Sequence, residues 1–528
     1  MRILNREIEA LRTDPRRIMA FAWAWILAWA VIRIFFAGAF PLSPDETNYW
    51  QWGRHLDWSY HDQAPMIGWA IGFFTWLFGN NEVAVRLPSI LSLTLASGYM
   101  VFFARRFFGV RTALAVALLS QGVLEFNAGG LLATADGVQA LGWSAAAYHT
   151  ARAYEEDTWC QWLAAGFWLG FGLLSKYTMV IFAVSALGYG LATARHRWRL
   201  AGLKPWVAVV LGLAMFSPVI VWNVAHDWNS LRHVAHIGGA NQGFSLHVKY
   251  LGEFLGSQLA LLTPLVFVLI LWAWWRALRG GEARRNWVVS YCVWTSLPMF
   301  GLFLVMSLQN RVYGNWPGAG FLTATVLAAA FFAPGARGVE ERPRPRWWRA
   351  TVVTAYALTL IALIQVATAV FPLPVSIDRT ASELAGWRRL GARVHEIRGR
   401  MPDPDDTFLF GMRYQVASEL AFYVPGQPET VSINKWARPN VYDYWVEDGG
   451  MVGMDAVGAT RRVEYWPRLL PRIFERVEGP EELRIYRTLP LTGTKQYVRS
   501  FYIWRCFGFK GGLRWVPPEG DVRSSGAF

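Results

Sequence analysis

A short stretch of the chain holds an unusual set of titratable side chains. Between positions 45 and 65 lie four carboxylates, two imidazoles and one arginine: Asp45, Glu46, Asp57, Asp62, His55, His61 and Arg54. The stretch follows directly on a segment apolar enough to cross a membrane. Ionisable groups at a membrane boundary are costly, which makes them functional-site candidates by default. We therefore predict that this stretch is a catalytic loop.

Asp45 and Glu46 are adjacent, so their side chains cannot face the same direction in a helix or in an extended chain. One carboxylate can face a cleft while the other caps a helix, and a helix cap with a solvated neighbour is the plainer alternative. Asp62, beside His61, supplies a second polar cluster that a folded-back loop would bring near Asp45. Paired carboxylates can divide labour, one as general base and one holding a metal, water or hydroxyl. A solvated Asx-turn at Asp62 explains the same residues.

Several basic side chains fall on the side of the membrane predicted to carry this loop. They are Lys176, Arg232, Arg311, His226 and His233. Cations that converge on a cleft suit a phosphate group, whose charge grows as it departs. Each of them could equally extend toward lipid headgroups. Lys176 is the strongest candidate because it occupies a very short turn.

His61, Asp62 and His226 offer ligands for a divalent metal ion, although their spacing matches no specific metal signature. The sequence requires no other cofactor. A metal bridging Asp62 and a phosphate therefore stands as an alternative to a metal-free site.

The composition is that of a membrane protein. Of the 528 residues, 54% are hydrophobic, only 17% are charged, and 30 are tryptophan. The net charge of +14 reflects the orientation of the chain in the membrane. Of the lysines and arginines between apolar segments, 22 fall in alternate gaps and only five fall in the other gaps. The positive-inside rule produces such alternation, whereas nucleic-acid binding would not. We therefore expect no nucleic-acid partner.

The apolar segments predict an all-α polytopic membrane domain with about 11 transmembrane helices. They lie at about 18–40, 83–104, 112–131, 138–152, 159–174, 178–194, 206–223, 251–275, 287–307, 317–334 and 351–371. Residues 1–17 and the basic linker 334–349 are then cytoplasmic. The membrane domain covers residues 1–371, with its first outer loop at 41–82. Residues 66–79 are too short to span the membrane with ease and are expected to lie on the outer leaflet of the same membrane.

Residues 372–528 turn mixed in composition and predict a small extracytoplasmic α/β domain. We expect an amphipathic helix at 380–398, strands at 407–410 and 430–433, and a helix at 414–423 between them. The last forty residues give no clear pattern.

Several motifs resemble a known family. They are Asp45-Glu46 with Tyr49-Trp50, Tyr60-His61-Asp62 with Pro65-Met66, Val85-Arg86-Leu87-Pro88, Ala133-Thr134-Ala135-Asp136, Leu174-Ser175-Lys176-Tyr177, Trp222-Asn223 and Asn315-Trp316-Pro317. In this order they resemble the GT-C glycosyltransferases that use polyprenyl-phosphate sugars. The nearest resemblance is to the protein O-mannosyltransferases, glycosyltransferase family 39, and to the bacterial aminoarabinose (lipid A) transferases.

The resemblance implies a GT-C membrane domain, a lipid-linked sugar donor, and Asp45 as the catalytic carboxylate with Glu46 beside it. The aminoarabinose transferases place an arginine three residues after the aspartate and an acidic-basic-Pro-Pro run at the end of the loop. This chain has Asn48 and Asp62-Gln63-Ala64-Pro65 at those positions. More weight for phosphate binding then falls on other cations. The predicted donor-phosphate and substrate-binding residues are Lys176, Arg311, Arg232, Asn48, Tyr49, Tyr60, Gln63 and Asp136.

We predict an inverting glycosyltransferase that moves a sugar from a polyprenyl phosphate to a lipid, glycan or protein acceptor. It would act at the outer face of a bacterial inner membrane, among membrane lipids, with a cytoplasmic N-terminus. Two alternatives are a transporter or flippase of a lipid-linked saccharide, and a non-catalytic binding scaffold. Inverted repeats would favour the transporter, and we detect none. The sequence does not identify the sugar or the acceptor.

Overall fold

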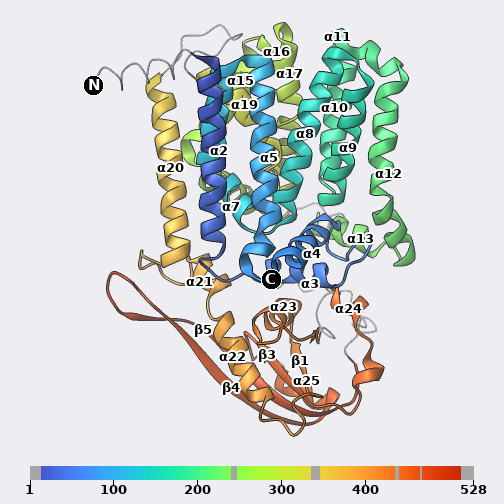
Figure 1. The fold of residues 1–528 in the computed structure, drawn as a ribbon, viewed down its shortest axis with the longest axis vertical. Coiled ribbons are helices and arrows are strands. Elements are labelled where there is room, and N and C mark those ends of the chain that lie inside the picture. The colour runs from blue at the N-terminus through green and yellow to red at the C-terminus, as the bar shows by residue number, and fades with distance from the viewer. Residues whose placement is uncertain (1–13, 239–245, 334–344, 434–438, 464–465, 513–528) are drawn as a thin grey trace. The chain divides into compact units, whose positions relative to one another are not determined.

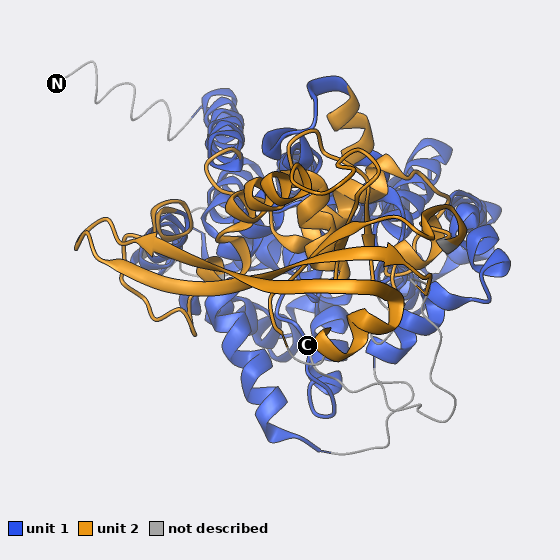
Figure 2. Ribbon diagram, turned by 90° about the horizontal axis from the view of Figure 1, so that it is seen from below, with its two compact units in different colours: residues 1–37, 63–70, 77–363 blue, residues 38–62, 71–76, 364–528 orange. Residues whose placement is uncertain are grey.

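A computed structural model describes residues 14–238, 246–333, 345–433, 439–463 and 466–512. Residues 1–13 and most of the linker 334–349, both predicted to be cytoplasmic, lie outside these ranges. The chain forms two compact units (Figure 2). Unit 1 contains residues 1–37, 63–70 and 77–363, and unit 2 contains residues 38–62, 71–76 and 364–528. The contacts thus group much of the first loop, predicted at 41–82, with the C-terminal residues.

Unit 1 is a helical bundle (Figure 1). Its helices are α2 (Pro15–Ala37), α5 (Glu82–Phe108), α6 (Val110–Gly122), α7 (Leu124–Leu131), α8 (Ala135–Glu156), α9 (Trp159–Ser175), α10 (Met179–Ala192), α11 (Ala194–Arg197), η1 (Trp198–Ala201), α12 (Leu203–Ala225), α13 (Asn229–Ile237), α14 (Val248–Leu261), α15 (Pro264–Arg279), α16 (Glu282–Arg285), α17 (Trp287–Trp294), α18 (Leu297–Met306) and α19 (Gly320–Phe332), with most of α20 (Pro345–Thr368). Helix α4 (Met66–Phe78) has residues in both units.

Five stretches of helix among the described residues are long and apolar enough to cross a membrane, or up to seven if each of two bent pairs is counted as one span. The chain is therefore an integral membrane protein. A helix lies at each of the predicted segments, but several are shorter than the lipid hydrocarbon layer requires. The predicted count of 11 spans is not confirmed.

Two of the predicted spans are not straight helices. The segment 112–131 divides into α6 and α7, which meet at 65°, and the segment 251–275 divides into α14 and α15, which meet at 107°. The second break has a local cause, since Thr263 has a positive φ of 66° and Pro264 begins α15. Proline cannot continue the preceding helix because it lacks the amide donor. The segment predicted as a span at 251–275 therefore consists of two helices with a sharp bend between them.

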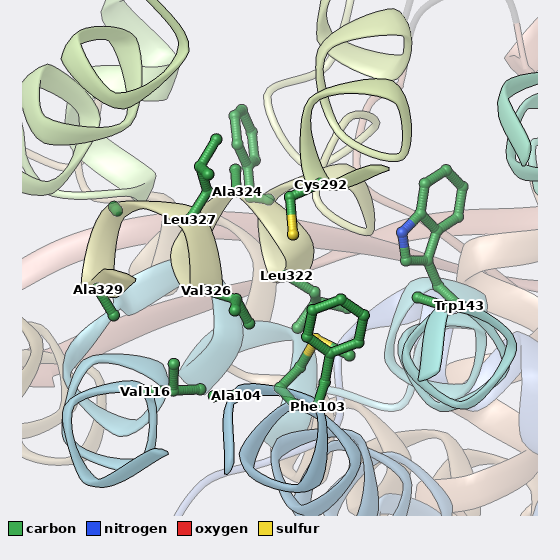
Figure 3. Packing of buried hydrophobic residues seen from close by; sticks show 14 of the residues in the cluster. Phe103, Ala104, Val116, Trp143, Cys292, Leu322, Ala324, Val326, Leu327 and Ala329 are labelled. Atoms are coloured by element: carbon green, nitrogen blue, oxygen red, sulfur yellow. The ribbon is translucent and has the colours of Figure 1, made fainter. Parts of the chain in front are cut away.

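Helix α19 lies at the centre of the apolar core of unit 1. Figure 3 shows Val326 of this helix pointing toward Val116 of α6 and Ala104 of α5, whereas Leu327 points to the opposite side of the helix and Cys292 of α17 also lies on that side. Every residue of α19 is buried. A helix that is apolar on all sides is expected to be enclosed by other helices, which is what the structure shows.

A mixed five-stranded sheet organises unit 2, in the order β2-β1-β3-β5-β4. The strands are β1 (Phe408–Gly411), β2 (Thr430–Ser432), β3 (Ala456–Thr460), β4 (Phe474–Thr488) and β5 (Lys495–Phe509). Strand β1 runs parallel to β2 and β3, and β5 runs antiparallel to β3 and β4. The helices are α3 (Pro44–Arg54), α21 (Arg379–Leu384), α22 (Trp387–Arg398), α23 (Tyr414–Tyr423), α24 (Tyr442–Trp445), η2 (Asp448–Met451) and α25 (Trp466–Ile473).

The α/β prediction for the C-terminal region is confirmed at β1, α23 and β2. The single helix predicted at 380–398 is wrong, because the chain breaks between α21 and α22 at Gly386. Gly386 has a φ of 96°, a conformation that glycine adopts without strain. The C-terminal residues without a clear sequence pattern include most of β5, which pairs with β4 in a long hairpin.

A close contact between α8 and α9 depends on glycine. A Cβ atom at Gly142 would lie 2.7 Å from the Cα of Gly172, whereas one at Gly301 of α18 would meet nothing within 4 Å. Small residues allow membrane helices to approach closely. We expect Gly142→Ala to lower the free energy of unfolding by about 1–3 kcal/mol through overpacking. Gly301→Ala should leave it unchanged or raise it by up to about 1 kcal/mol. Thermal unfolding in detergent measures both variants, and equal Tm values would contradict the prediction.

Candidate active site

Helix α3 presents Asp45 at its beginning. Ser43 is the N-cap and Pro44 the first helical residue, so Asp45 and Glu46 fall in the first turn. Proline is favoured at this position because its missing N–H would be unpaired there anyway. The Glu46 carboxylate accepts a hydrogen bond of 2.8 Å from the Ser43 backbone N–H, which is the reciprocal half of a capping box. Glu46 is fully buried, whereas Asp45 is exposed. The two carboxylates diverge, as predicted from their adjacency.

The buried face of α3 packs against α23 within unit 2. Trp50 meets Phe422 edge to face, with ring centroids 4.9 Å apart. Before the helix, the backbone N–H of Leu42 donates to the Tyr423 hydroxyl at 2.6 Å. Two aromatic residues of α23 thus hold the helix that carries Asp45.

The end of α3 is held by polar contacts. Gln51 donates to the Tyr442 hydroxyl at 3.2 Å. Arg54 pairs with Glu429 and lies 4.9 Å above the Trp50 ring. The His55 Nε2 lies 3.1 Å from the same Glu429 carboxylate. A hydrogen bond from His55, together with the nearby Arg54, lowers the pKa of Glu429 below its ordinary value. Arg54 therefore contributes to the anchoring of the loop.

The aromatic residues predicted to bind substrate support the loop structurally. Tyr60 is stacked on Trp52 with ring centroids 4.3 Å apart, and its hydroxyl donates to the Trp52 carbonyl at 2.8 Å. Burial raises the pKa of Tyr60 above its ordinary value. Tyr49 is also buried and meets Trp52 edge to face. Asn48, 4% exposed, has a buried Oδ1 without a hydrogen-bond partner among the described residues.

Glu419 of α23 is a buried carboxyl that the sequence reasoning missed. It is 1% exposed, and neither of its carboxylate oxygens accepts a hydrogen bond of good geometry from the described residues. Burial and the nearby Glu46 carboxylate raise the pKa of Glu419 well above its ordinary value. A glutamate within the apolar run Val416–Phe422 was the available signal in the sequence. The structure places it on α23, the helix that packs against α3.

Unit 1 holds a second polar cluster, around Asp136. This residue lies in the first turn of α8, whose N-cap Thr134 accepts from the Gly137 N–H. Lys176, at the end of α9, places its Nζ 2.6 Å from one Asp136 oxygen. Asn315 donates to the other oxygen at 3.2 Å. Three of the predicted motifs, far apart in sequence, therefore meet, and the anion beside Lys176 is a carboxylate of the same chain.

The remaining predicted cations are separate from this cluster in their contacts. Arg311 pairs with Glu253 at 3.3 Å and is 60% exposed, and Arg232 is exposed on α13. His226 stacks on Trp222, with its Nδ1 2.8 Å from the Trp222 carbonyl oxygen. Their assignment as phosphate ligands stays a prediction.

The predicted metal ligands are divided between the units. His61 and Asp62 belong to unit 2, and the His61 Nδ1 lies 3.0 Å from the Tyr444 hydroxyl. His226 belongs to unit 1, as does the partly buried Gln63. In both histidines Nδ1 lies within hydrogen-bond distance of a partner. The metal site stays a prediction.

Comparison with known proteins supports the family resemblance. Residues 62–222 match the family model for dolichyl-phosphate-mannose-protein mannosyltransferase. A lipid A galacturonosyltransferase, RgtD of Rhizobium johnstonii, is 26% identical over 308 residues, which cover 57% of this chain and 62% of the relative. The crystal structure of ArnT from Cupriavidus metallidurans in the apo state superimposes with a TM-score of 0.63 at 14% identity, over 92% of this chain and 98% of ArnT.

The resemblance is confirmed. The same ArnT bound to undecaprenyl phosphate gives a TM-score of 0.61 over equal shares of the two chains. At 14% identity these likenesses establish the fold, and the alignment with RgtD spans less than two thirds of that relative. The chain therefore has an ArnT-like fold.

Within this ArnT-like fold, Glu419 generates a pH dependence. A carboxyl whose pKa is raised in the folded state stabilises the protein most below its ordinary pKa of 4.5. That contribution is lost as the pH rises toward the raised value. Glu419→Gln keeps the size and removes the titration, so its Tm relative to the parent should increase with pH above about 4.5. Thermal unfolding across pH measures this, with the exposed Glu447→Gln as control. Parallel curves for parent and Glu419→Gln would contradict it.

The Asp136–Lys176 pair generates a second prediction. The side chains are 21% and 13% exposed, so removal of either partner leaves a poorly solvated charge. We expect Asp136→Asn and Lys176→Met to destabilise the protein individually and to show a coupling energy of about 1–3 kcal/mol in a double-mutant cycle. The exposed Lys249–Glu253 pair, 3.9 Å apart, should give about 0.5 kcal/mol or less. Unfolding in detergent measures both cycles, and equal coupling energies would refute the difference.

Proposed function

We propose that the protein is a glycosyltransferase that takes a sugar from a polyprenyl-phosphate donor. The observation that carries the proposal is the orientation of Asp45. It is the exposed member of the Asp-Glu pair, on a helix whose first turn is held by a capping box. The mannosyltransferase family match, the ArnT-like fold and the galacturonosyltransferase relative support it.

The proposed reaction is a single displacement with inversion at the anomeric carbon. The Asp45 carboxylate takes the proton of an acceptor hydroxyl as its oxygen bonds to the anomeric carbon. The bond from that carbon to the phosphate oxygen breaks, and polyprenyl phosphate leaves with the electron pair. Cationic donors stabilise the charge that develops on this phosphate. Lys176, Arg232 and Arg311 remain the proposed ligands for it.

The acceptor is proposed to be a glycolipid of the lipid A type, because RgtD is named as a lipid A galacturonosyltransferase. A galacturonosyl polyprenyl phosphate and lipid A are therefore the first pair to test. Lysine and arginine placement supports a cytoplasmic N-terminus and an extracytoplasmic unit 2 in a bacterial inner membrane.

Glu46 has a different proposed role from Asp45. Its carboxylate is buried in the capping box, so it shapes the beginning of α3 and does not touch the substrate. Glutamine can replace glutamate in such a box. Substitutions at the two positions therefore separate catalysis from helix capping.

Asp45→Asn should reduce sugar transfer about 100-fold or more, since a positioned general base contributes roughly that factor. Glu46→Gln and the exposed Asp405→Asn should retain most of the activity. Transfer by the purified variants from a synthetic polyprenyl-phosphate sugar to lipid A, followed by mass spectrometry, measures the effect. Parent-level transfer by Asp45→Asn would exclude Asp45 as the base. A parent that binds donor but never transfers sugar would favour a transporter.

A further inference from the structure

Three arginines lie at one edge of the sheet in unit 2. Strand β1 pairs with β3 so that Gly411 lies opposite Ala459, and the Met412 N–H still bonds to the Ala459 carbonyl. Continued by two residues, this register places Arg413 opposite Arg461. Both residues therefore follow the carboxyl ends of neighbouring parallel strands.

Arg499 of β5 joins them from the other side of β3. Thr460 pairs with Tyr502, so the antiparallel register continues from Arg461 to Phe501, and Arg499 shares the face of Phe501. The guanidinium groups also meet one short helix, because Arg461 donates to the Ser382 carbonyl and Arg499 to the Ala381 carbonyl of α21. Sheet register and hydrogen bonds agree that the arginines converge.

The topology of the sheet makes this edge a favourable place for a ligand. From β1 the chain continues through α23 to β2 on one side, whereas from β3 it leads to β4 beyond the other side. Ligands of open α/β sheets bind where neighbouring strands send their connections in opposite directions. Arg413 is also the N-cap of the ten-residue helix α23, whose dipole favours an anion there.

Positive charge exceeds negative charge at this edge. Arg413 forms no ion pair among the described residues, and Arg461 pairs only at 3.7 Å with Glu383. Glu383 and Glu419 are the carboxyl groups that act on Arg461 and Arg499, so the three arginines face at most two negative charges. Arg499 is 9% exposed, and its Nη1 has no hydrogen-bond partner among the described residues. Burial and the nearby Arg461 lower the pKa of Arg499 to about 10. Buried polar groups are nearly always hydrogen-bonded, so the unpartnered Nη1 of Arg499 requires an explanation.

A role limited to holding α21 accounts for only part of this arrangement. It explains the hydrogen bonds that one nitrogen of Arg461 and one of Arg499 donate to carbonyls of that helix. It does not explain the unpartnered Nη1 of Arg499 or the presence of Arg413. An oxyanion would accept from both and would balance the charge.

We propose that the carboxyl ends of β1 and β3 form a binding site for a phosphate-type oxyanion, held by Arg413, Arg461 and Arg499 at the N-terminus of α23. Arg461, 38% exposed, marks the side open to solvent. The site shares no residue with the proposed active site, and it does not depend on the proposed transferase activity.

Equilibrium dialysis of the full-length protein in detergent with labelled inorganic phosphate tests this site, with ionic strength fixed by chloride. The parent should bind phosphate saturably at a site that the Arg413 substitution weakens. Arg413→Gln should weaken binding about tenfold or more through the loss of charge-assisted hydrogen bonds. Arg413 is the decisive position because it makes no ion pair that the fold needs. Arg505→Gln, an exposed arginine on the same strand as Arg499, should bind as the parent does.

Arg499→Gln should also lose binding, and an unchanged Tm without phosphate shows that the variant is folded. Asp45→Asn should bind phosphate normally, which separates this inference from the proposed function. No saturable binding by the parent, or equal affinities for the parent and Arg413→Gln, would overturn the proposal.

Vesicles that contain lipid A distinguish the sources of the oxyanion. Displacement of bound phosphate by phosphorylated but not by dephosphorylated lipid A assigns the site to a glycolipid phosphate. No displacement by either assigns it to a free oxyanion. Equal displacement by both would contradict recognition of phosphate.

Discussion

The contact between α3 and α23 is the constraint on which the candidate active site depends. Asp45 is exposed, and an exposed aspartate at a helix end has no inherent position. Its direction follows from the buried Glu46 cap and from the Trp50–Phe422 contact one turn later. Because α23 also leads from β1 to β2, the sheet indirectly sets where the carboxylate points.

Burial of acidic groups in this contact has a cost, and the structure limits it in two ways. The Glu46 carboxylate accepts the Ser43 backbone N–H, which gives one of its buried oxygens a hydrogen-bond partner. Burial, together with the nearby Glu46 carboxylate, raises the pKa of Glu419, which disfavours a second negative charge in this contact. In unit 1 the charge of Asp136 is instead compensated by a direct ion pair with Lys176.

Local features of the structure could be predicted from the sequence, and features set by long-range pairing could not. The divergence of Asp45 and Glu46 follows from helix geometry, and β1, α23 and β2 follow from periodicity and turn residues. The break at Gly386 and the bend at Thr263 require a positive φ that periodicity does not reveal. The convergence of Arg413, Arg461 and Arg499 depends on strand register, although Arg413 was visible as the junction between a predicted strand and helix. Similarly, nothing near Lys176 in the sequence indicates that its partner is Asp136.

The grouping of residues 38–62 with residues 364–528 has a consequence for biosynthesis. The loop that carries Asp45 is translated early, whereas α23, on which it packs, is made only after the last long apolar helix. Contacts between residues so far apart in sequence form only after a large loss of chain entropy on loop closure. The nascent loop therefore reaches its final arrangement only after α23 has been synthesised. Premature termination after α20 would leave the membrane helices in place and the proposed base without its support.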